Sequence, residues 1–384
     1  MTEILTVAIA CILLTALFIA VYWRDVVCVG EIPVSFFTLM AILFTSGLDV
    51  GLVMFPLVDF QVYASEADYA FSNPLAIEFR FWGFLVWGLY FTTTVYFCII
   101  EPKLKLFEIP LIKWVNDLVI IGTCAFTGFL FLSYLPDYIA GITPLQRLLL
   151  VALVVLLAVI SSTHIRFVRI LSVSSTLLFF ALILGVGWSS GMGITGLYQS
   201  MATLGDYFRH LPRFLAPITD YHEFYLYWWF AWSIMIGQFV SRFVGGIKIS
   251  RLLLALLIVP SIPIALWFSV LYHYFATDME VTAGWRWAMV AVGTLFVVNS
   301  LDSLMRLYTR NIGITVQRLG NSTYVLFNWS ILFGLILLYQ LTPLRIEWFG
   351  LAVIALYTAV TLLIIKHRNA PIWPKRRASN GAVS

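Results

Sequence analysis

The amino-acid sequence predicts an all-α, polytopic membrane protein. Hydrophobic residues make up 61% of the 384 positions and charged residues only 11%. Soluble globular proteins carry about 25% charged residues, so this composition is typical of a chain embedded in lipid. A bilayer core of about 30 Å needs roughly 20 apolar residues per helix. Eleven apolar runs meet this length, at about 4–22, 34–58, 81–99, 113–135, 146–163, 169–189, 223–243, 250–274, 285–305, 321–341 and 346–365.

So little chain remains outside these runs that a separate catalytic domain is excluded. No nucleophile, metal-ligand or phosphate-binding constellation stands at usable spacing, so we expect no enzyme, no cofactor and no resident metal. The histidines fall at or near span ends or in surface segments and are expected to be solvated: His164, His210, His222, His273 and His367. The cysteines have no metal or disulfide spacing and fit small packing residues: Cys11, Cys28, Cys98 and Cys124.

The basic residues set the expected orientation. Seventeen of the 23 Lys and Arg residues fall in alternate loops and in the basic C-terminal segment from Lys366 onward. The positive-inside rule places these loops and the C-terminus in the cytoplasm, and eleven spans then leave the N-terminus outside. The first run lacks a basic leader and a clear cleavage site, which favours a retained helix. The net charge of +4 reflects this loop bias, so we expect no nucleic-acid partner. The segment 59–79 holds Asp59, Glu66, Asp68 and Glu78 without Lys or Arg, as expected for an outer loop.

A long segment divides the remaining spans into two groups of five. Its apolar residues recur every three or four positions and predict an amphipathic surface helix: Leu197, Met201, Leu204, Phe208 and Leu211. Two groups of five spans are typical of inverted-repeat transporters. We therefore expect an extra N-terminal helix in 1–30, the first repeat in 31–190, the surface segment 191–221, the second repeat in 222–366 and the tail 367–384.

The second run interrupts its own apolar pattern. Gly47 and Gly51 permit close approach of a helix or a ligand, and Pro56 removes a backbone donor. The glycines alone also fit a helix-packing stripe. Asp49 is costly at this depth and must be neutral, paired or hydrated. It is a candidate proton carrier or a partner for a cationic substrate, and a structural hydrogen-bonding role is the alternative.

Tryptophan and tyrosine gather in two of the runs. Trp228, Trp229 and Trp232 lie within one run, and Trp82, Trp87 and Tyr90 within another, at spacings that bring rings onto shared helix faces. Such rings attract cations, quaternary ammonium groups above all. Membrane-interface belts or simple packing are the alternative explanation.

One further run carries polar residues after Phe296, namely Asn299, Ser300, Asp302 and Ser303. Their oxygens could ligate Na⁺, or they could satisfy backbone groups and pair with a neighbouring helix.

These residues together resemble a known family. The run Trp228-Trp229-Phe230-Ala231-Trp232-Ser233, with Gly237 and Arg242 after it, resembles the signature helix of the betaine/choline/carnitine transporters. Trp82, Trp87 and Tyr90 are similar to the second aromatic-box helix of that family. Gly47 to Gly51 matches its glycine stretch, Phe296 to Asp302 its sodium-site helix, and Leu204 to Pro212 its surface helix.

The resemblance implies a LeuT-type core of ten helices in two inverted repeats, alternating access and frequent trimers. It implies a substrate site of Trp82, Trp87, Tyr90, Trp229 and Trp232. The chain departs from the family as a short, divergent member. Ile234 replaces a proline, Asn299 replaces a sodium-site threonine, and Asp49 stands in the glycine stretch.

We therefore expect a proton-coupled secondary transporter of a quaternary ammonium or related methylated compound. The coupling-ion residues would be Asp49, Phe296, Asn299 and Ser300, for H⁺ or Na⁺. The alternative is a transporter-derived sensor or scaffold that binds ligand without turnover. The expected location is the bacterial inner membrane, with lipid and a small-molecule substrate as partners and a homotrimer as the assembly.

Overall fold

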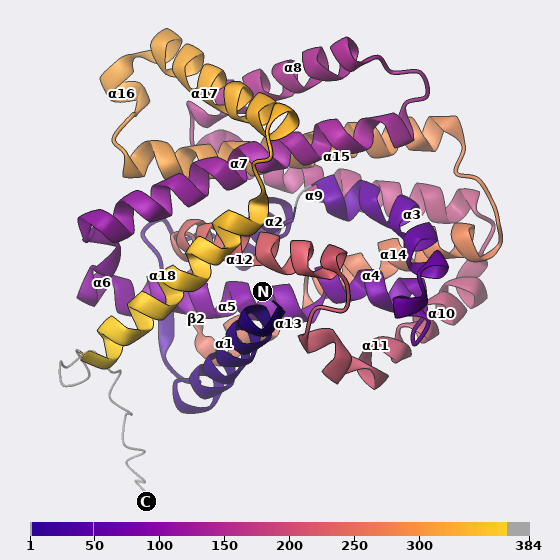
Figure 1. The fold of residues 1–384 in the computed structure, drawn as a ribbon, viewed down its shortest axis with the longest axis horizontal. Helices are drawn as coiled ribbons and strands as arrows, with labels where there is room; N and C mark the ends of the chain where they lie inside the picture. The colour runs from indigo at the N-terminus through magenta and orange to yellow at the C-terminus, as the bar shows by residue number, and fades with distance from the viewer. Residues whose placement is uncertain (1, 49, 367–384) are drawn as a thin grey trace, which may run out of the picture.

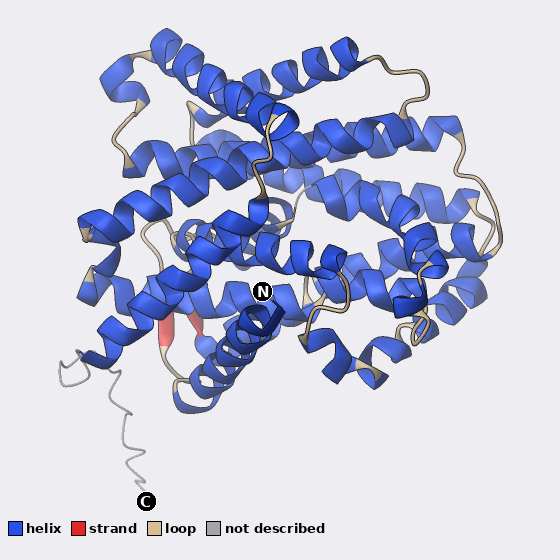
Figure 2. Ribbon diagram, in the orientation of Figure 1, coloured by secondary structure: helices blue, strands red, loops and turns tan. Residues whose placement is uncertain are grey.

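The computed structural model describes residues 2–48 and 50–366, and most of this chain is helical (Figures 1 and 2). Each predicted run is found as a helix or a helix pair. These are α1 (Thr2–Tyr22), α2 and α3 (Phe36–Gly47, Val50–Ser65), α4 and α5 (Pro74–Trp82, Phe84–Val95), α7 (Pro110–Tyr138), α8 (Pro144–Ser162), α9 (Arg166–Ser189), α12 (Asp220–Ser241), α13 and α14 (Ile249–Ile258, Ser261–Ala276), α15 (Ala283–Asn311), α17 (Asn321–Leu341) and α18 (Ile346–Lys366).

Shorter elements connect these helices. They are the strands β1 (Val27–Val29) and β2 (Gly245–Lys248), the 3₁₀ turns η1 (Ala67–Tyr69), η3 (Leu106–Glu108) and η4 (Leu211–Leu215), the π-helical turn η2 (Tyr96–Ile100), and the short helices α6 (Glu101–Leu104), α10 (Gly193–Thr203), α11 (Gly205–Arg209) and α16 (Val316–Leu319).

Within the described residues, nine helices are long and apolar enough to cross a membrane, or ten if the bent pair of α2 and α3 forms one span. Helix α12 is the remaining predicted span. Its tyrosines, tryptophans and first-turn acids lower its hydropathy, but most of its residues are buried by other helices. It therefore needs little lipid-facing surface. The all-α, polytopic fold class is confirmed, and the count agrees roughly with eleven spans.

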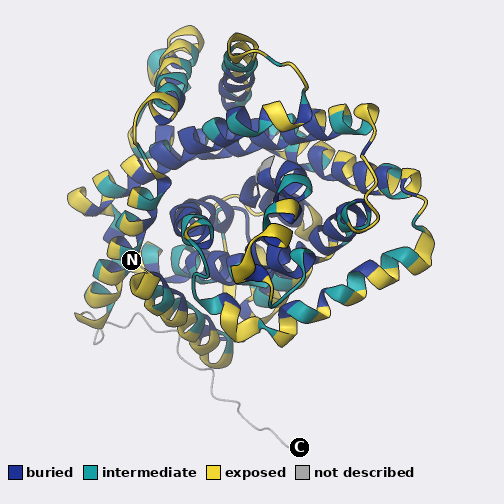
Figure 3. Ribbon diagram, turned by 45° about the vertical axis from the view of Figure 1, so that its right-hand side comes forward, coloured by how far each residue is buried: buried dark blue, intermediate teal, exposed yellow. Residues whose placement is uncertain are grey.

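The helices pack in two matching sets of five. Helix α2 packs on α9, as α12 packs on α18. Helices α8 and α9 pack on α15, as α17 and α18 pack on α7, and α5 packs on α12, as α14 packs on α3. Replacing each span of the first set by its counterpart in the second set thus reproduces these contacts, as expected for a repeat. Helices α7 and α15 run side by side across the molecule (Figure 1), and buried residues gather in the middle of the bundle (Figure 3).

The second span is broken as predicted, but not at its proline. Helix α2 ends at Gly47, Leu48 is extended with φ −127° and ψ 148°, and the two halves bend by 48°. Pro56 stays inside α3. A proline leaves the carbonyl four residues earlier without its helical donor. The indole of Trp267 donates to that carbonyl, on Leu52, at 3.1 Å, so the helix can continue.

A second break, between α4 and α5, is not predicted from the sequence. Gly83 adopts φ −86° and ψ −145°, and its N–H donates to the Phe79 carbonyl at 2.8 Å. A Cβ at position 83 would lie 2.8 Å from that same carbonyl oxygen. The break therefore depends on the missing side chain.

An antiparallel ribbon of β1 and β2 is also missing from the all-helical prediction. It pairs Val27 with Lys248 and Cys28 with Ile247. Backbone hydrogen bonds extend this contact from Gly30, Ile32 and Val34 to the carbonyls of residues 242–244 at 2.7–3.1 Å. A Cβ at Gly30 would lie 2.3 Å from two of the facing carbonyl oxygens, so only glycine fits. The ribbon ties the start of α2 to the end of α12.

The surface segment lies where it was predicted, but it is not one helix. Helix α10 packs on α14, α11 packs on α4, and η4 follows. Leu204 is buried, whereas Phe208 is 58% exposed. The segment thus covers the ends of α4 and α14 in short pieces.

Candidate functional site

The five predicted aromatic residues come together at the break in the second span. Trp82 lies at the end of α4, Trp87 and Tyr90 lie in α5, and Trp229 and Trp232 lie in α12. None of their side chains is more than 2% exposed. We call these five residues the aromatic group.

Ring contacts join the two repeats within this group. Trp82 meets Trp229 edge to face, with centroids 5.1 Å apart, and Tyr90 meets the same indole at 6.3 Å. Trp87 lies on the other side of Tyr90, at 5.3 Å. Trp229 therefore has one ring from each half of the broken α4–α5 helix against it.

The carbonyl of Gly47 anchors the group to α2. Tyr90 donates its hydroxyl to this oxygen at 2.8 Å, and the indole N–H of Trp232 donates to it at 3.1 Å. A Cβ at Gly47 would lie 3.3 Å from the Tyr90 ring and 3.6 Å from the Trp87 ring. The glycine thus allows the helix end to approach the aromatic faces, as the sequence predicted for this stretch.

The indole N–H groups differ in their partners. Trp87 donates to the Trp82 carbonyl at 3.0 Å, and Trp82 donates to Glu78 at 2.8 Å. Among the described residues, Trp228 and Trp229 have buried indole nitrogens without an acceptor. Their rings stack 5.1 Å apart at 11°. Trp228 also packs against Phe55 and Phe126, as expected for a packing residue.

Two of the predicted coupling-ion residues contact the same break from α15. Ser300 Oγ lies 3.2 Å from the Leu48 carbonyl and 3.4 Å from the Thr45 carbonyl. Asn299 donates its amide N–H to the Thr45 hydroxyl at 2.7 Å and to the Ser46 hydroxyl at 3.2 Å. Asp49 lies outside the described residues.

Phe296 takes a packing position beside them. Its ring meets Phe44 at 6.0 Å and Phe179 at 5.7 Å. Its ring closes the apolar side of the contact between α2 and α15 and carries no ligand atom of its own.

Asn299 presents donors where a cation would need acceptors. Its amide nitrogen faces the two hydroxyls of α2, and its oxygen accepts from Ser172 at 3.2 Å. Sodium is a hard cation that binds oxygen, so an N–H₂ group here uses up hydroxyl oxygens that could otherwise bind it. In the described part of the chain, no group of three or more His, Cys, Asp or Glu residues could hold a metal ion.

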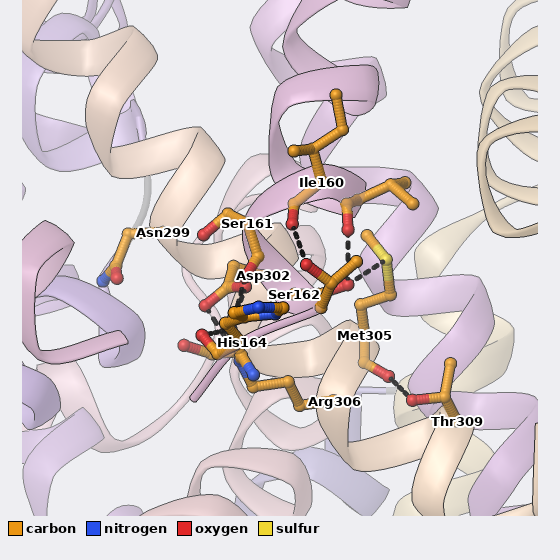
Figure 4. A network of polar contacts seen from close by, with 12 residues as sticks. Ile160, Ser161, Ser162, His164, Asn299, Asp302, Met305, Arg306 and Thr309 are labelled. Carbon is orange, nitrogen blue, oxygen red and sulfur yellow. Dashed lines mark hydrogen bonds and ion pairs between the residues drawn. The ribbon is translucent and has the colours of Figure 1, made fainter. Parts of the chain in front are cut away.

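Asp302 has a structural partner (Figure 4). Arg306 donates to both of its carboxylate oxygens, at 3.1 and 2.9 Å, within α15. The same guanidinium donates to the carbonyls of Ser161 and His164 at the end of α8, at 2.7 and 2.8 Å. The side chain of Asp302 is 0% exposed and that of Arg306 is 9% exposed. Asp302 therefore ties α15 to the α8–α9 connection, which is the neighbouring-helix alternative considered for this motif.

A buried acidic cluster escaped the sequence reasoning, which placed Asp59 and Glu78 in an outer loop. Asp59 lies in α3 and Glu78 in α4, and they are 2% and 0% exposed. The loop assignment is wrong for these two residues because both helices extend further than their apolar runs. The available signal was the spacing of four that pairs Asp59 with Tyr63 and Glu78 with Trp82.

His222 is also a correction, because it was expected to be solvated. It is fully buried at the start of α12 and accepts hydrogen bonds at Nδ1 from Arg80, at 2.5 Å, and from the Ile218 N–H, at 3.2 Å. Arg80 donates further to the carbonyls of Phe214 and Ala216. These bonds fasten the end of the surface segment to α4 and α12.

A groove of about 860 Å³ lies apart from the aromatic group. Apolar residues of α1, α5 and α18 line most of it, with Thr93 and Tyr357 among the polar contributors. Two of its walls, α1 and α18, are long and apolar enough to cross a membrane, so lipid chains are its expected surroundings.

The fold and the site define an integral membrane protein of two five-helix repeats, with an aromatic group at a broken helix. A model described as betaine/carnitine/choline family transporter matches residues 119–291. This match confirms the resemblance to the family that the motifs indicated.

Individual matches are partial. An uncharacterized transporter of Mycobacterium tuberculosis is 34% identical over 84 residues, which are 19% of this chain and 14% of that protein. The glycine betaine transporter OpuD of Bacillus subtilis is 23% identical over 299 residues, or 66% of this chain and 58% of the relative. The chain thus matches less than two thirds of either relative. The structure of a Na⁺-coupled sialic acid symporter aligns with a TM-score of 0.48 and 14% identity, covering 95% of this chain and 83% of that one.

Proposed function

We propose that the protein is a secondary active transporter of a quaternary ammonium or related methylated compound of the betaine, choline or carnitine type. The contact of Trp82 and Tyr90 with Trp229 carries this proposal. Once a cation has lost its water, indole and phenol faces attract it by about 2 kcal/mol per contact. A trimethylammonium head fits this chemistry because it has no N–H donors and therefore needs no hydrogen-bond acceptors from the site. A transport role, rather than catalysis, agrees with the family.

The site is closed in the described conformation, and both repeats contribute to it. Transport by alternating access requires a site at the repeat interface that opens to one side at a time. The break after Gly47 supports this mode because both repeats donate hydrogen bonds to the same helix end.

Proton coupling is proposed in preference to sodium coupling. The amide of Asn299 occupies the hydroxyls of Thr45 and Ser46, which leaves a sodium ion fewer free oxygen ligands. Asp49 would carry the proton. The homotrimer, the inner-membrane location, the outside N-terminus and the cytoplasmic C-terminus belong to the same proposal.

The test is uptake of labelled choline and glycine betaine into proteoliposomes. Trp229→Leu should abolish it, whereas Trp188→Leu, whose parent side chain is 90% exposed, should leave it unchanged. Full uptake by Trp229→Leu would remove this residue from the site. Asp49→Asn should abolish uptake against a gradient while exchange survives, and an unaltered pH dependence would remove Asp49 from the coupling.

A ligand-binding sensor without turnover is the second candidate. The observation that favours it is the Asn299 contact, which replaces ion ligands with a fixed link between α2 and α15. Binding of choline to purified protein without flux in proteoliposomes would support the sensor.

A further inference from the structure

Asp59 and Glu78 lie beside the aromatic group and are joined through one tyrosine. The Tyr63 hydroxyl lies 2.7 Å from Glu78 Oε2 and 3.4 Å from Asp59 Oδ2. Asp59 Oδ2 also accepts from the hydroxyls of Tyr221 and Tyr225, at 2.8 and 3.2 Å. Both carboxyl groups are thus bonded, but only by neutral hydroxyl and indole donors.

Within residues 2–48 and 50–366, no cation pairs with either of these carboxyl groups. None of the ion pairs among the described residues includes Asp59 or Glu78. The nearest basic residue on α4, Arg80, directs its guanidinium to the carbonyls of Phe214 and Ala216 and to His222. Two like charges within roughly 6 Å in a dry interior repel strongly, and burial adds the cost of lost hydration. Holding one proton between them removes that repulsion.

The surroundings of the pair supply no further positive charge at contact. The titratable and charged groups that face it are Tyr63 on α3, Tyr69 on η1, Glu78 and Arg80 on α4, Tyr134, Asp137 and Tyr138 on α7, and Tyr221, His222 and Tyr225 on α12. Tyr272 of α14 packs against Phe60, next to Asp59 in the chain. His222 accepts at Nδ1 from Arg80 and from a backbone N–H, so it stands as the neutral ring.

A direct bond links this pair to the aromatic group. The indole N–H of Trp82 donates to Glu78 Oε1 at 2.8 Å, and the Trp82 ring lies 5.1 Å from Trp229. Glu78 therefore contacts both Tyr63, which joins it to Asp59, and Trp82, which belongs to the aromatic group.

We propose that Asp59 and Glu78, joined through Tyr63, form a binding site for one proton, and that the Glu78–Trp82 hydrogen bond links this proton to occupancy of the aromatic group. The link, but not the proton site, rests on the proposed function. A cation among the rings and a proton on the pair both add positive charge at one place, so they compete. The proton leaves the pair as the cation arrives.

Infrared spectroscopy of the purified full chain in lipid nanodiscs tests the proton site without any ligand. Titration from about pH 5 to about pH 9 should show a carboxylic-acid band that Asp59→Asn and Glu78→Gln each remove or shift. Asp68→Asn, an exposed acid in the neighbouring turn, should leave it in place. A titration identical in wild type and both variants would overturn the proton site. The amides are close in shape to the protonated acids, and a melting curve of each variant shows that it folds.

Trp82→Phe and choline test the link. Removing the indole donor leaves the Glu78 carboxylate less stabilised, so the band should persist to higher pH. Saturating choline, compared with the same concentration of NaCl, should make it disappear at lower pH. A tenfold coupling would move the midpoint by about one pH unit. A midpoint that choline raises or leaves in place, while choline binds, would overturn the link. Absence of choline binding would count against the proposed function and leave the ligand-free titration to decide the proton site.

Discussion

Tyr90 and Trp232 donate hydrogen bonds to one atom, the carbonyl oxygen of Gly47, although they belong to different repeats. Gly47 is the last residue of α2, so its carbonyl has no partner within the helix. The side chains of α5 and α12 thus complete the end of α2 at the point where the span breaks.

Tyr90→Phe removes one of these donors and keeps the ring. We expect a loss of about 1 kcal/mol in the free energy of unfolding, because Trp232 still satisfies the carbonyl. Adding Trp232→Phe leaves that buried acceptor without these two donors, which costs a further 1–3 kcal/mol or so. Denaturant unfolding in detergent measures both, with Tyr198→Phe (74% exposed) as the neutral control. Strictly additive losses would show that the two donors do not share an acceptor.

Gly237→Ala should be strongly destabilising. The added Cβ would lie 2.4 Å from the Cβ and Oγ1 atoms of Thr93 and 2.9 Å from the Thr93 backbone carbon. Overpacking typically costs about 1–3 kcal/mol, and a backbone contact places this change at the upper end. Thermal unfolding compares it with Gly334→Ala in α17, where a Cβ meets nothing within 4 Å. Equal melting temperatures for the two variants would contradict close packing of α5 on α12.

Asp302→Asn should destabilise the contact between α15 and the α8–α9 connection. Arg306 would keep its carbonyl acceptors but lose its buried counterion, a change that costs about 3–5 kcal/mol. The double variant Asp302→Asn with Arg306→Met should recover part of this loss, since no unpaired charge remains. Arg209→Met breaks an exposed pair with Asp206 and should change stability by less than about 1 kcal/mol. A double variant less stable than Asp302→Asn would argue against an uncompensated charge.

The contacts of Glu31 with Arg310 and Arg242 join the segment before α2 to the ends of α12 and α15, and we expect them to be sensitive to acid. Hydrogen bonds from Arg310 at 2.9 and 3.3 Å, aided by Arg242, hold the pKa of Glu31 below its ordinary value of 4.5. A lowered pKa in the folded state means that the stabilisation is full above about pH 4.5 and is lost as the pH falls through the folded value. Glu31→Gln should therefore lower the melting temperature at neutral pH and differ less from wild type below about pH 4. If the difference in melting temperature between Glu31→Gln and wild type grew as the pH fell, the conclusion that the pKa of Glu31 is lowered in the folded state would be wrong.

The helices could be predicted because the bilayer imposes both their length and their composition. Most span ends lie within four residues of the apolar runs, but α3, α4 and α15 extend six or seven residues beyond them, and Asp59 and Glu78 lie in two of these extensions. An apolar run ends at the first charge, whereas a helix continues wherever partners for that charge exist. Only the tertiary contacts of Tyr63, Tyr221 and Trp82 reveal those partners.

Local breaks were harder to predict than spans. Pro56 is the stronger breaker by sequence, but Trp267, over 200 residues away, supplies the donor that keeps its helix intact. Gly83 carries no distinctive signal, because its effect depends on the position of the Phe79 carbonyl. The aromatic group was predicted because spacing and residue type alone place its rings on two helix faces. Its shared acceptor on Gly47 was not, since that bond depends on how the repeats meet.

The ribbon of β1 and β2 constrains how the protein can move. Backbone hydrogen bonds from Gly30, Ile32 and Val34 fasten the approach to α2 onto the residues that follow α12. We therefore expect α2 and α12, the first helices of the two repeats, to move together as one rigid unit. Tilting α12 must carry α2 with it, and the flexure falls to the unclamped far side of the break, where α3 meets α14. Access to the aromatic group would then change when α3 moves relative to α2 and α12, rather than when the two repeats separate.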